Sequence, residues 1–141
     1  MEAIFMDKAW KDVKAFHEAF NVPVQEKPCK LEQDRVHKRA DWMMEEIREF
    51  LEAKTLTEQA DAMIDVMYLA LGTLVEMGVR PEELFRIVHE ANMSKLWEDG
   101  KPRYRESDGK VIKPPTWQAP EPLLSKEIAR QQSECDDKQE Q

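Results

Sequence analysis

Hydrophobic residues recur at helical spacing in four stretches of the chain, and these stretches predict four α-helices. The predicted helices cover residues 7–20, 31–53, 60–77 and 81–97. In the second stretch the apolar positions alternate in steps of four and three, as on the face of a helix that packs against a core. These positions are Val36, Ala40, Met43, Ile47 and Phe50.

Residues with known preferences for helix ends mark the boundaries of these stretches. Asp7 and Thr57 can accept hydrogen bonds at a helix N-terminus, and Pro81 is favoured in a first turn. Gly78 follows the third stretch, where a helix commonly ends in a left-handed residue. With only 4 glycines and few alternating β-branched runs, we expect an all-α fold, an antiparallel bundle of four main helices.

The amino-acid composition of the chain changes after Gly100. Residues 101–115 are rich in basic side chains and contain Asp108-Gly109, a dipeptide typical of tight turns, so they predict a short hairpin-like extension. Residues 121–141 are polar and low in apolar side chains, which indicates a flexible tail. We therefore expect one domain over residues 1–120, followed by a tail over residues 121–141.

The formal net charge of -8 argues against a nucleic acid polymer as the main partner. The longest apolar stretch, residues 66–75, is too short to cross a membrane. Residues 1–7 lack a basic region followed by an apolar run, and Cys29 and Cys135 are far apart in the sequence. We therefore expect no signal peptide, no structural disulfide and a cytoplasmic location.

The third predicted helix is apolar on nearly every side, yet it carries Asp61 and Asp65. A helix of this kind is normally buried, and a buried carboxylate is costly unless a positive group accompanies it. The two aspartates are four residues apart and so lie on one face of the helix. A metal ion, a proton, or basic side chains such as Arg35 and Arg39 must therefore balance their charge.

Carboxylates on the second predicted helix can meet this face. Because the connection between the two helices is short, we expect an antiparallel hairpin. Counting outward from the turn brings Glu49 level with Asp61 and Glu45 level with Asp65, with Glu46 between these levels. Several carboxylates in one cleft repel one another without a cation, and ligands that are all oxygen suit Mg²⁺ or Mn²⁺.

These acidic residues resemble the motif of the MazG-like all-α nucleoside triphosphate pyrophosphohydrolases, a superfamily that includes phosphoribosyl-ATP pyrophosphohydrolase. The family pattern E-E-x-x-E followed by E-x-x-D is matched by residues 45–49 and 58–61. Residues 61–68, and the C-terminal segments 89–97, 99–102 and 108–111, are similar to one bacterial branch. Only eight residues separate Glu49 from Glu58, where the family usually has a dozen or more, and this departure favours Asp65 over Glu58 as a ligand.

The resemblance implies Mg²⁺-dependent cleavage between the α and β phosphates of a nucleoside triphosphate, in a homodimer or homotetramer. The side chains expected to hold the metal are Glu46, Glu49, Glu58, Asp61 and Asp65, and the expected catalytic residues are Glu45 and Glu46. Two alternatives remain open: a phosphoribosyl-ATP pyrophosphohydrolase, and a non-catalytic dimerisation module that binds nucleotide and metal.

Polar side chains near the C-terminal end of the predicted bundle are candidates for binding the substrate. His89, Asn92 and Lys95 are spaced three apart and share a helix face, so an amide and an ammonium can reach a base or a phosphate together. The basic extension can close over phosphates through Arg103, Arg105 and Lys110.

Overall fold

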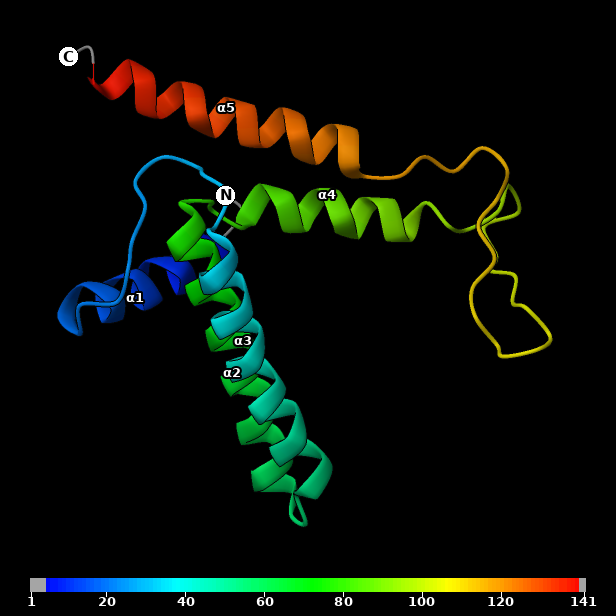
Figure 1. The fold of residues 1–141 in the computed structure, drawn as a ribbon. Helices are drawn as coiled ribbons and strands as arrows, with labels where there is room; N and C mark the ends of the chain where they lie inside the picture. The colour runs from blue at the N-terminus through cyan, green and yellow to red at the C-terminus, as the bar shows by residue number, and fades with distance from the viewer. Residues whose placement is uncertain (1–4, 140–141) are drawn as a thin grey trace.

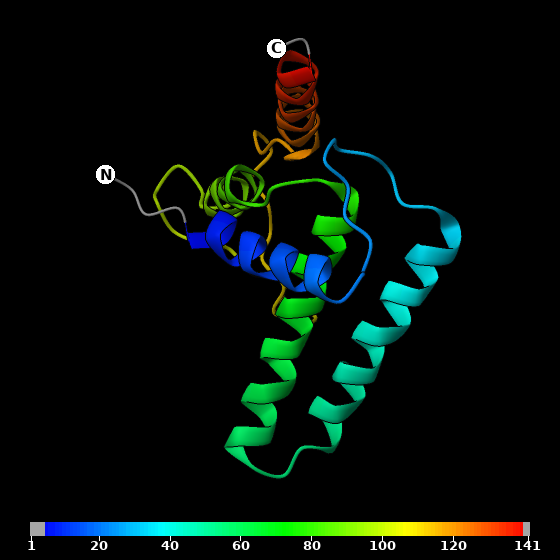
Figure 2. The ribbon, with the colours of Figure 1, turned by 90° about the vertical axis from the view of Figure 1, so that its left-hand side faces the viewer.

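The computed structural model describes residues 5–139, and within them it shows five α-helices and no strand (Figure 1). The helices are α1 (Phe5–Ala19), α2 (Gln33–Glu52), α3 (Leu56–Met77), α4 (Glu82–Met93) and α5 (Glu121–Gln139). α2 and α3 form a long antiparallel hairpin, α1 packs across α3, and α4 and α5 lie side by side beyond the base of the hairpin (Figures 1 and 2). The predicted all-α fold is confirmed.

The expectation of a flexible tail over residues 121–141 is wrong for residues 121–139, which form α5; residues 140 and 141 lie outside the described part. Polar composition was misleading because α5 docks through hydrogen bonds rather than through a wide apolar face. The buried Gln131 side chain accepts a hydrogen bond from the Arg80 N–H (2.9 Å) and donates to the Arg80 carbonyl (3.2 Å). It also donates to the buried carboxylate of Glu127 at 3.1 Å.

Two helix starts differ from the prediction. α3 begins at Leu56 because the Thr55 hydroxyl, not that of Thr57, accepts the capping hydrogen bond, from the Glu58 N–H at 3.1 Å. Asp7 lies within α1 and serves another helix, since its Oδ1 accepts a hydrogen bond from the Glu82 N–H at 3.0 Å. Glu82 in turn accepts hydrogen bonds from the N–H groups of Met6 (2.7 Å) and Asp7 (3.1 Å). The starts of α1 and α4 therefore cap each other.

The remaining predicted boundary features, at Gly78, in the extension after Gly100 and at Pro81, are present. Gly78 ends α3 with a φ of 69°, and a Cβ there would lie 2.8 Å from the Lys27 carbonyl oxygen. The hairpin-like extension is confirmed by an isolated antiparallel bridge between Tyr104 and Val111. α4 starts directly after Pro81 and ends at Met93, four residues earlier than expected.

A buried ionic cluster joins the first three helices. Glu76, 2% exposed on α3, accepts two hydrogen bonds from Arg35 (2.9 and 2.8 Å) and a further one from Arg39. Arg39 also donates to Nε2 of the buried His17 (3.2 Å), whose Nδ1 lies 2.9 Å from the Pro23 carbonyl oxygen. Because the Pro23 carbonyl can only accept and the Arg39 guanidinium can only donate, these contacts fit a ring that donates from Nδ1 and accepts at Nε2. Burial alone would raise the pKa of Glu76, but the two arginines hold it below its ordinary value.

Close packing at this cluster requires a glycine on α3. A Cβ on Gly72 would lie 2.8 Å from His17 Nε2 and 3.1 Å from Arg39 Nη1. A small apolar core adjoins the cluster on the α1 side and consists of Trp10, Val13 and Val75, with Val24, Leu71 and Leu74 packed around them.

The expected burial of the third helix is not found within one chain. Along α3 only Ala62, Gly72, Val75 and Glu76 are buried. Ile64 is 59% exposed and Met67 is 55% exposed, because α3 has only α1 and α2 as helical neighbours in the described part of the chain. Between residues 5 and 139 no single helix is long and apolar enough to cross a membrane; only α3 and α4 taken together, bent by 119°, reach that length and composition.

We expect Glu76→Ala to lower the free energy of unfolding by about 3–5 kcal/mol, because it leaves two guanidinium groups in a buried site without their counter-charge. Urea denaturation followed by circular dichroism measures this loss. The matched control is Glu90→Ala, which removes an exposed carboxylate paired with Arg86 and is expected to cost at most about 1 kcal/mol. Equal losses in both variants would show that the buried cluster does not hold the helices together.

Candidate metal centre

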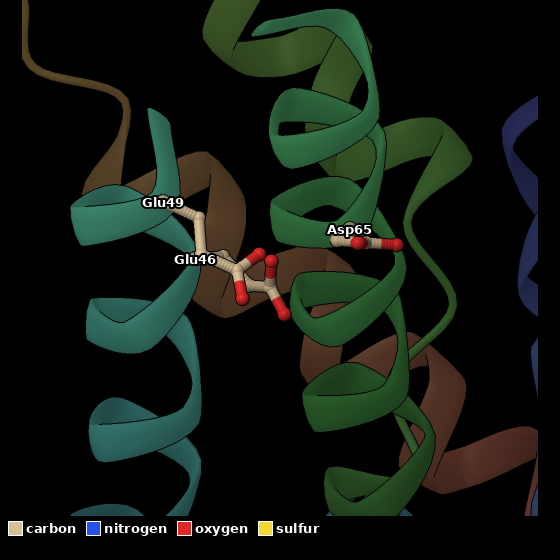
Figure 3. A group of neighbouring side chains, drawn as sticks. All are labelled: Glu46, Glu49 and Asp65. Atoms are coloured by element: carbon tan, nitrogen blue, oxygen red, sulfur yellow. The ribbon is translucent and has the colours of Figure 1, made fainter. Parts of the chain in front are cut away.

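Three carboxylates meet between α2 and α3, partway along the hairpin. Glu46, Glu49 and Asp65 each offer a carboxylate oxygen, and these oxygens lie within 4.8 Å of one another. Glu46 and Glu49 are one helical turn apart and extend from α2 toward α3, which carries Asp65 (Figure 3). The short turn after α2 is what sets this register, because it forces the two helices to run antiparallel.

The electrostatics of this carboxylate cluster are unfavourable without a positive charge. Oε2 of Glu46 is buried and has no hydrogen-bond partner in the part of the chain that is described. Burial raises the pKa of Glu46 to about 7, and a side-chain hydrogen bond with Glu49 and the charges of Glu49, Asp65 and Asp61 act in the same direction. A hydrogen bond between two carboxyl groups requires a proton on one of them, so ionised Glu46 has only repulsive neighbours.

The donor set fits a divalent metal ion. All the available ligands are carboxylate oxygens, one of them buried and unpaired, which is the chemistry that Mg²⁺ and Mn²⁺ prefer. The alternative expectation, that Arg35 and Arg39 balance the aspartates of α3, is wrong because both arginines bind Glu76. Among residues 5–139 no ion pair joins a basic side chain to Glu46, Glu49 or Asp65.

The remaining predicted acidic residues lie around this cluster but not in it. Asp61 is exposed one turn from Asp65, and its charge contributes to the raised pKa of Glu46. Glu58 lies at the tip of the hairpin, where its carboxylate accepts a hydrogen bond from the Lys54 N–H at 3.3 Å. Glu45 is exposed on α2 and does not belong to the group of close oxygens.

The predicted substrate-binding residues are not brought to the carboxylates within one chain. Lys95 donates to Asn92 (2.9 Å), Arg103 lies over the Trp97 ring at 3.9 Å, and Arg105 pairs with Asp108. α4 and the segment that follows it extend away from the hairpin (Figure 1). The six side chains His89, Asn92, Lys95, Arg103, Arg105 and Lys110 are absent from the cavity wall described next.

A cavity of about 390 Å³ adjoins the carboxylate cluster. Its wall is formed by α1, α2 and α3 and by the residue Val22; the side chains are Phe16, His17, Val22, Arg39, Trp42, Glu46, Asp65, Tyr68 and Leu69. Trp42 is held by two arginines of the ionic cluster, with Arg35 at 5.6 Å and Arg39 at 5.2 Å from its ring centroid. Two members of the carboxylate cluster therefore share a cavity with three aromatic rings.

The aromatic residues of this cavity are not among the residues predicted from the sequence to form the site. A signal was available, since Trp42 lies one turn before Glu46 and Tyr68 lies three residues after Asp65, each on the same helix face as its carboxylate. Phe16 could not be found in this way, because only the crossing of α1 over α3 brings it to the site; its ring meets that of Tyr68 edge to face, with centroids 5.7 Å apart.

Comparison with known proteins agrees with this fold. The family model described as phosphoribosyl-ATP pyrophosphohydrolase matches residues 13–92, which include the whole carboxylate cluster. A crystal structure named as a "putative NTP pyrophosphohydrolase" from Exiguobacterium sp. 255-15 is similar at 35% sequence identity, with a TM-score of 0.53, over 89% of this chain and 96% of that chain. The comparison with curated proteins found no match.

The all-helical fold and the family match are thus those of a pyrophosphohydrolase, a hydrolase of phosphoric anhydrides. The chain belongs to the phosphoribosyl-ATP pyrophosphohydrolase family. The resemblance inferred from residues 45–49 and 58–61 is confirmed.

We expect the metal-free protein to lose stability as the pH rises from about 4.5 to about 7. In this window the unfolded chain releases the Glu46 proton while the folded chain retains it, so the free energy of unfolding falls; above pH 7 the loss is complete. Urea denaturation in a chelator, repeated across this range, measures the slope.

Glu46→Gln removes the titrating group and should flatten this pH dependence, whereas Glu45→Gln, which changes the exposed neighbouring carboxyl, should leave it in place. An unchanged slope in Glu46→Gln would contradict the assignment. Added Mg²⁺ should oppose the loss of stability, since it binds the ionised carboxylates of the folded chain.

Proposed function

We propose that this chain is a Mg²⁺-dependent nucleoside triphosphate pyrophosphohydrolase that cleaves between the α and β phosphates and releases a nucleoside monophosphate and pyrophosphate. The observation that carries this proposal is the cluster of Glu46, Glu49 and Asp65 beside a cavity that can hold an aromatic base. The family match supports cleavage of a phosphoric anhydride. Because the family model is described by phosphoribosyl-ATP, that nucleotide is the second candidate substrate.

The proposed metal ligands are Glu46, Glu49 and Asp65, with Asp61 one turn away. When bound, the cation supplies positive charge for the phosphate oxygens and acidifies water. Glu45 is exposed beside these ligands, and we assign it the acceptance of the proton from the attacking water. A carboxylate outside the ligand set suits this role because its lone pairs stay available.

The cavity suits the nucleoside end of the substrate. A volume of about 390 Å³ is adequate for a base and its sugar, and Trp42, Phe16 and Tyr68 offer aromatic surface for stacking. With the base in this cavity, the α phosphate is the first phosphate along the molecule to reach Glu46 and Asp65. This order supports cleavage of the α–β bond rather than of the β–γ bond.

Self-association belongs to the same proposal. α2 and α3 leave apolar side chains exposed, and the six polar residues predicted to bind substrate lie away from the carboxylates of their own chain. A homodimer or homotetramer would cover the apolar surface and can bring these side chains to a neighbouring site. We infer a cytoplasmic enzyme with a nucleotide substrate, and no nucleic acid polymer or membrane as partner.

The test is a screen of nucleoside triphosphates and phosphoribosyl-ATP with Mg²⁺, in which both products are identified by chromatography. We expect pyrophosphate and a monophosphate from at least one of these nucleotides. Asp65→Asn should lower kcat/KM by at least about a hundredfold, because it removes a ligand charge from the cluster. The matched control, Asp41→Asn, changes an exposed aspartate of α2 outside the cluster and should retain full activity.

A diphosphate and inorganic phosphate as products would contradict α–β cleavage. Full activity of Asp65→Asn would show that the metal lies elsewhere. Absence of hydrolysis, in a folded protein that binds Mg²⁺ and nucleotide, would favour the non-catalytic binding module.

A further inference from the structure

The cavity beside the carboxylate cluster has two chemically different ends. Glu46 and Asp65 form its acidic end, and Arg39 and His17 belong to the same wall. Arg39 lies seven residues before Glu46 on α2, which places it on the same helix face about 10 Å away along the axis. On α3, the position that approaches both Arg39 and His17 is Gly72, seven residues after Asp65. The cavity therefore runs from the carboxylates to an end formed by Arg39 and His17, which we call the Arg39 end.

Aromatic rings lie between the acidic end and the Arg39 end. Trp42 is midway between Arg39 and Glu46 along α2, and Tyr68 occupies the corresponding level of α3. A nucleobase that stacks on these rings, with its phosphates at the acidic end, turns the edge opposite the sugar toward Arg39. That edge carries the exocyclic oxygens and amino groups by which nucleobases differ.

The side chains of the Arg39 end present hydrogen-bond donors to the cavity. A guanidinium has only donors. Nε of Arg39 donates to Glu76 and Nη2 donates to His17 at 3.2 Å, whereas Nη1 has no protein acceptor among residues 5–139. Nε2 of His17 is occupied by Arg39, and its Nδ1 by the Pro23 carbonyl oxygen at 2.9 Å. Glu76, the acceptor of the ionic cluster, does not belong to the cavity wall.

A carbonyl oxygen at the edge of the nucleobase is complementary to this end, and an amino group is not. The oxygen can accept a charge-assisted hydrogen bond from the guanidinium. An amino group in the same place sets a donor against a donor, and both then lack a partner in a site shielded from water. The Tyr68 hydroxyl can donate or accept, so it does not change this preference.

The Arg39 end also limits the length of the substrate. His17 is 2% exposed and Arg39 is 3% exposed, so both are packed against the body of the protein. The volume of about 390 Å³ is adequate for one nucleobase and one sugar. Phosphoribosyl-ATP carries an additional ribose phosphate on its nucleobase, and this group would have to occupy the space that Arg39 and His17 fill.

We propose that this chain selects nucleoside triphosphates whose nucleobase has a carbonyl oxygen opposite the sugar, with Arg39 as the specificity-determining residue. Uracil, thymine, hypoxanthine and guanine belong to this class. Cytosine and adenine, which carry an amino group there, are disfavoured, and so is phosphoribosyl-ATP. The selectivity rests on the proposed function, which places the nucleobase in this cavity.

The test compares substrates that differ only at this edge. UTP and CTP form one pair and ITP and ATP the other, each exchanging a carbonyl for an amino group at constant sugar and ring size. With Mg²⁺ and the wild-type chain, kcat/KM should be at least about tenfold higher for UTP than for CTP and for ITP than for ATP, and lowest for phosphoribosyl-ATP. The deoxyribose series should give the same order. Equal values within a pair, or a preference for CTP, ATP or phosphoribosyl-ATP, would overturn the proposal.

A matched pair of variants assigns the preference to Arg39. Arg39→Gln replaces the guanidinium by an amide that can accept as well as donate, so the UTP/CTP and ITP/ATP ratios should fall at least about threefold. Arg35→Gln removes the other guanidinium that binds Glu76, but it lies outside the cavity wall and should leave both ratios unchanged. A ratio does not depend on the folded fraction, so a destabilised variant still reports on selectivity. An equal fall in both variants would refute the role of Arg39.

Binding of the monophosphate products makes the same comparison without turnover. Calorimetry with Mg²⁺ should give a lower dissociation constant for UMP than for CMP and for IMP than for AMP. A chain with this preference that hydrolyses no nucleotide would refute the proposed hydrolysis alone. A chain that hydrolyses nucleotides but binds the members of each pair equally would refute the selectivity alone.

Discussion

The structure depends on the buried contact between Glu76 and two arginines. Glu76 belongs to α3 and the arginines to α2, and through His17 the same hydrogen bonds reach α1. The cost of burying these charges is offset only because each has a partner, which ties three helices into one arrangement. Arg39 and His17 also line the cavity, and both arginines flank Trp42, so the shape of the site follows from the same contact.

The carboxylate cluster has the opposite effect on the hairpin, because its charges favour separation of α2 and α3. Glu46, Glu49 and Asp65 repel one another, and their repulsion lies within two to three turns of the ionic cluster on the same two helices. The paired charges at the base can hold the helices together against this repulsion. One hairpin therefore contains a base whose charges are paired and a middle whose carboxylates have no basic partner among the described residues.

Much of the architecture could be predicted from one sequence because it is local. The periodic apolar positions of α2, the turn before α3 and the left-handed Gly78 each reflect short-range chemistry, and together they place Glu49 and Asp65 on facing helices. α5 was not predicted, because long-range contacts hold it in place. Gln131 binds the backbone of Arg80, which lies 51 residues away in the sequence. Composition cannot reveal such partners.

The sequence by itself determined that carboxylates would gather at mid-hairpin, because helical spacing and a short turn leave little choice of register. It did not determine which carboxylates meet, and only the tertiary structure excluded Glu58 and assigned Arg35 and Arg39 to Glu76. The cavity was likewise decided by tertiary structure, since α1 must cross α3 before Phe16 and His17 can approach Asp65. Local periodicity specifies which face of a helix a residue occupies, whereas long-range packing decides what that face meets.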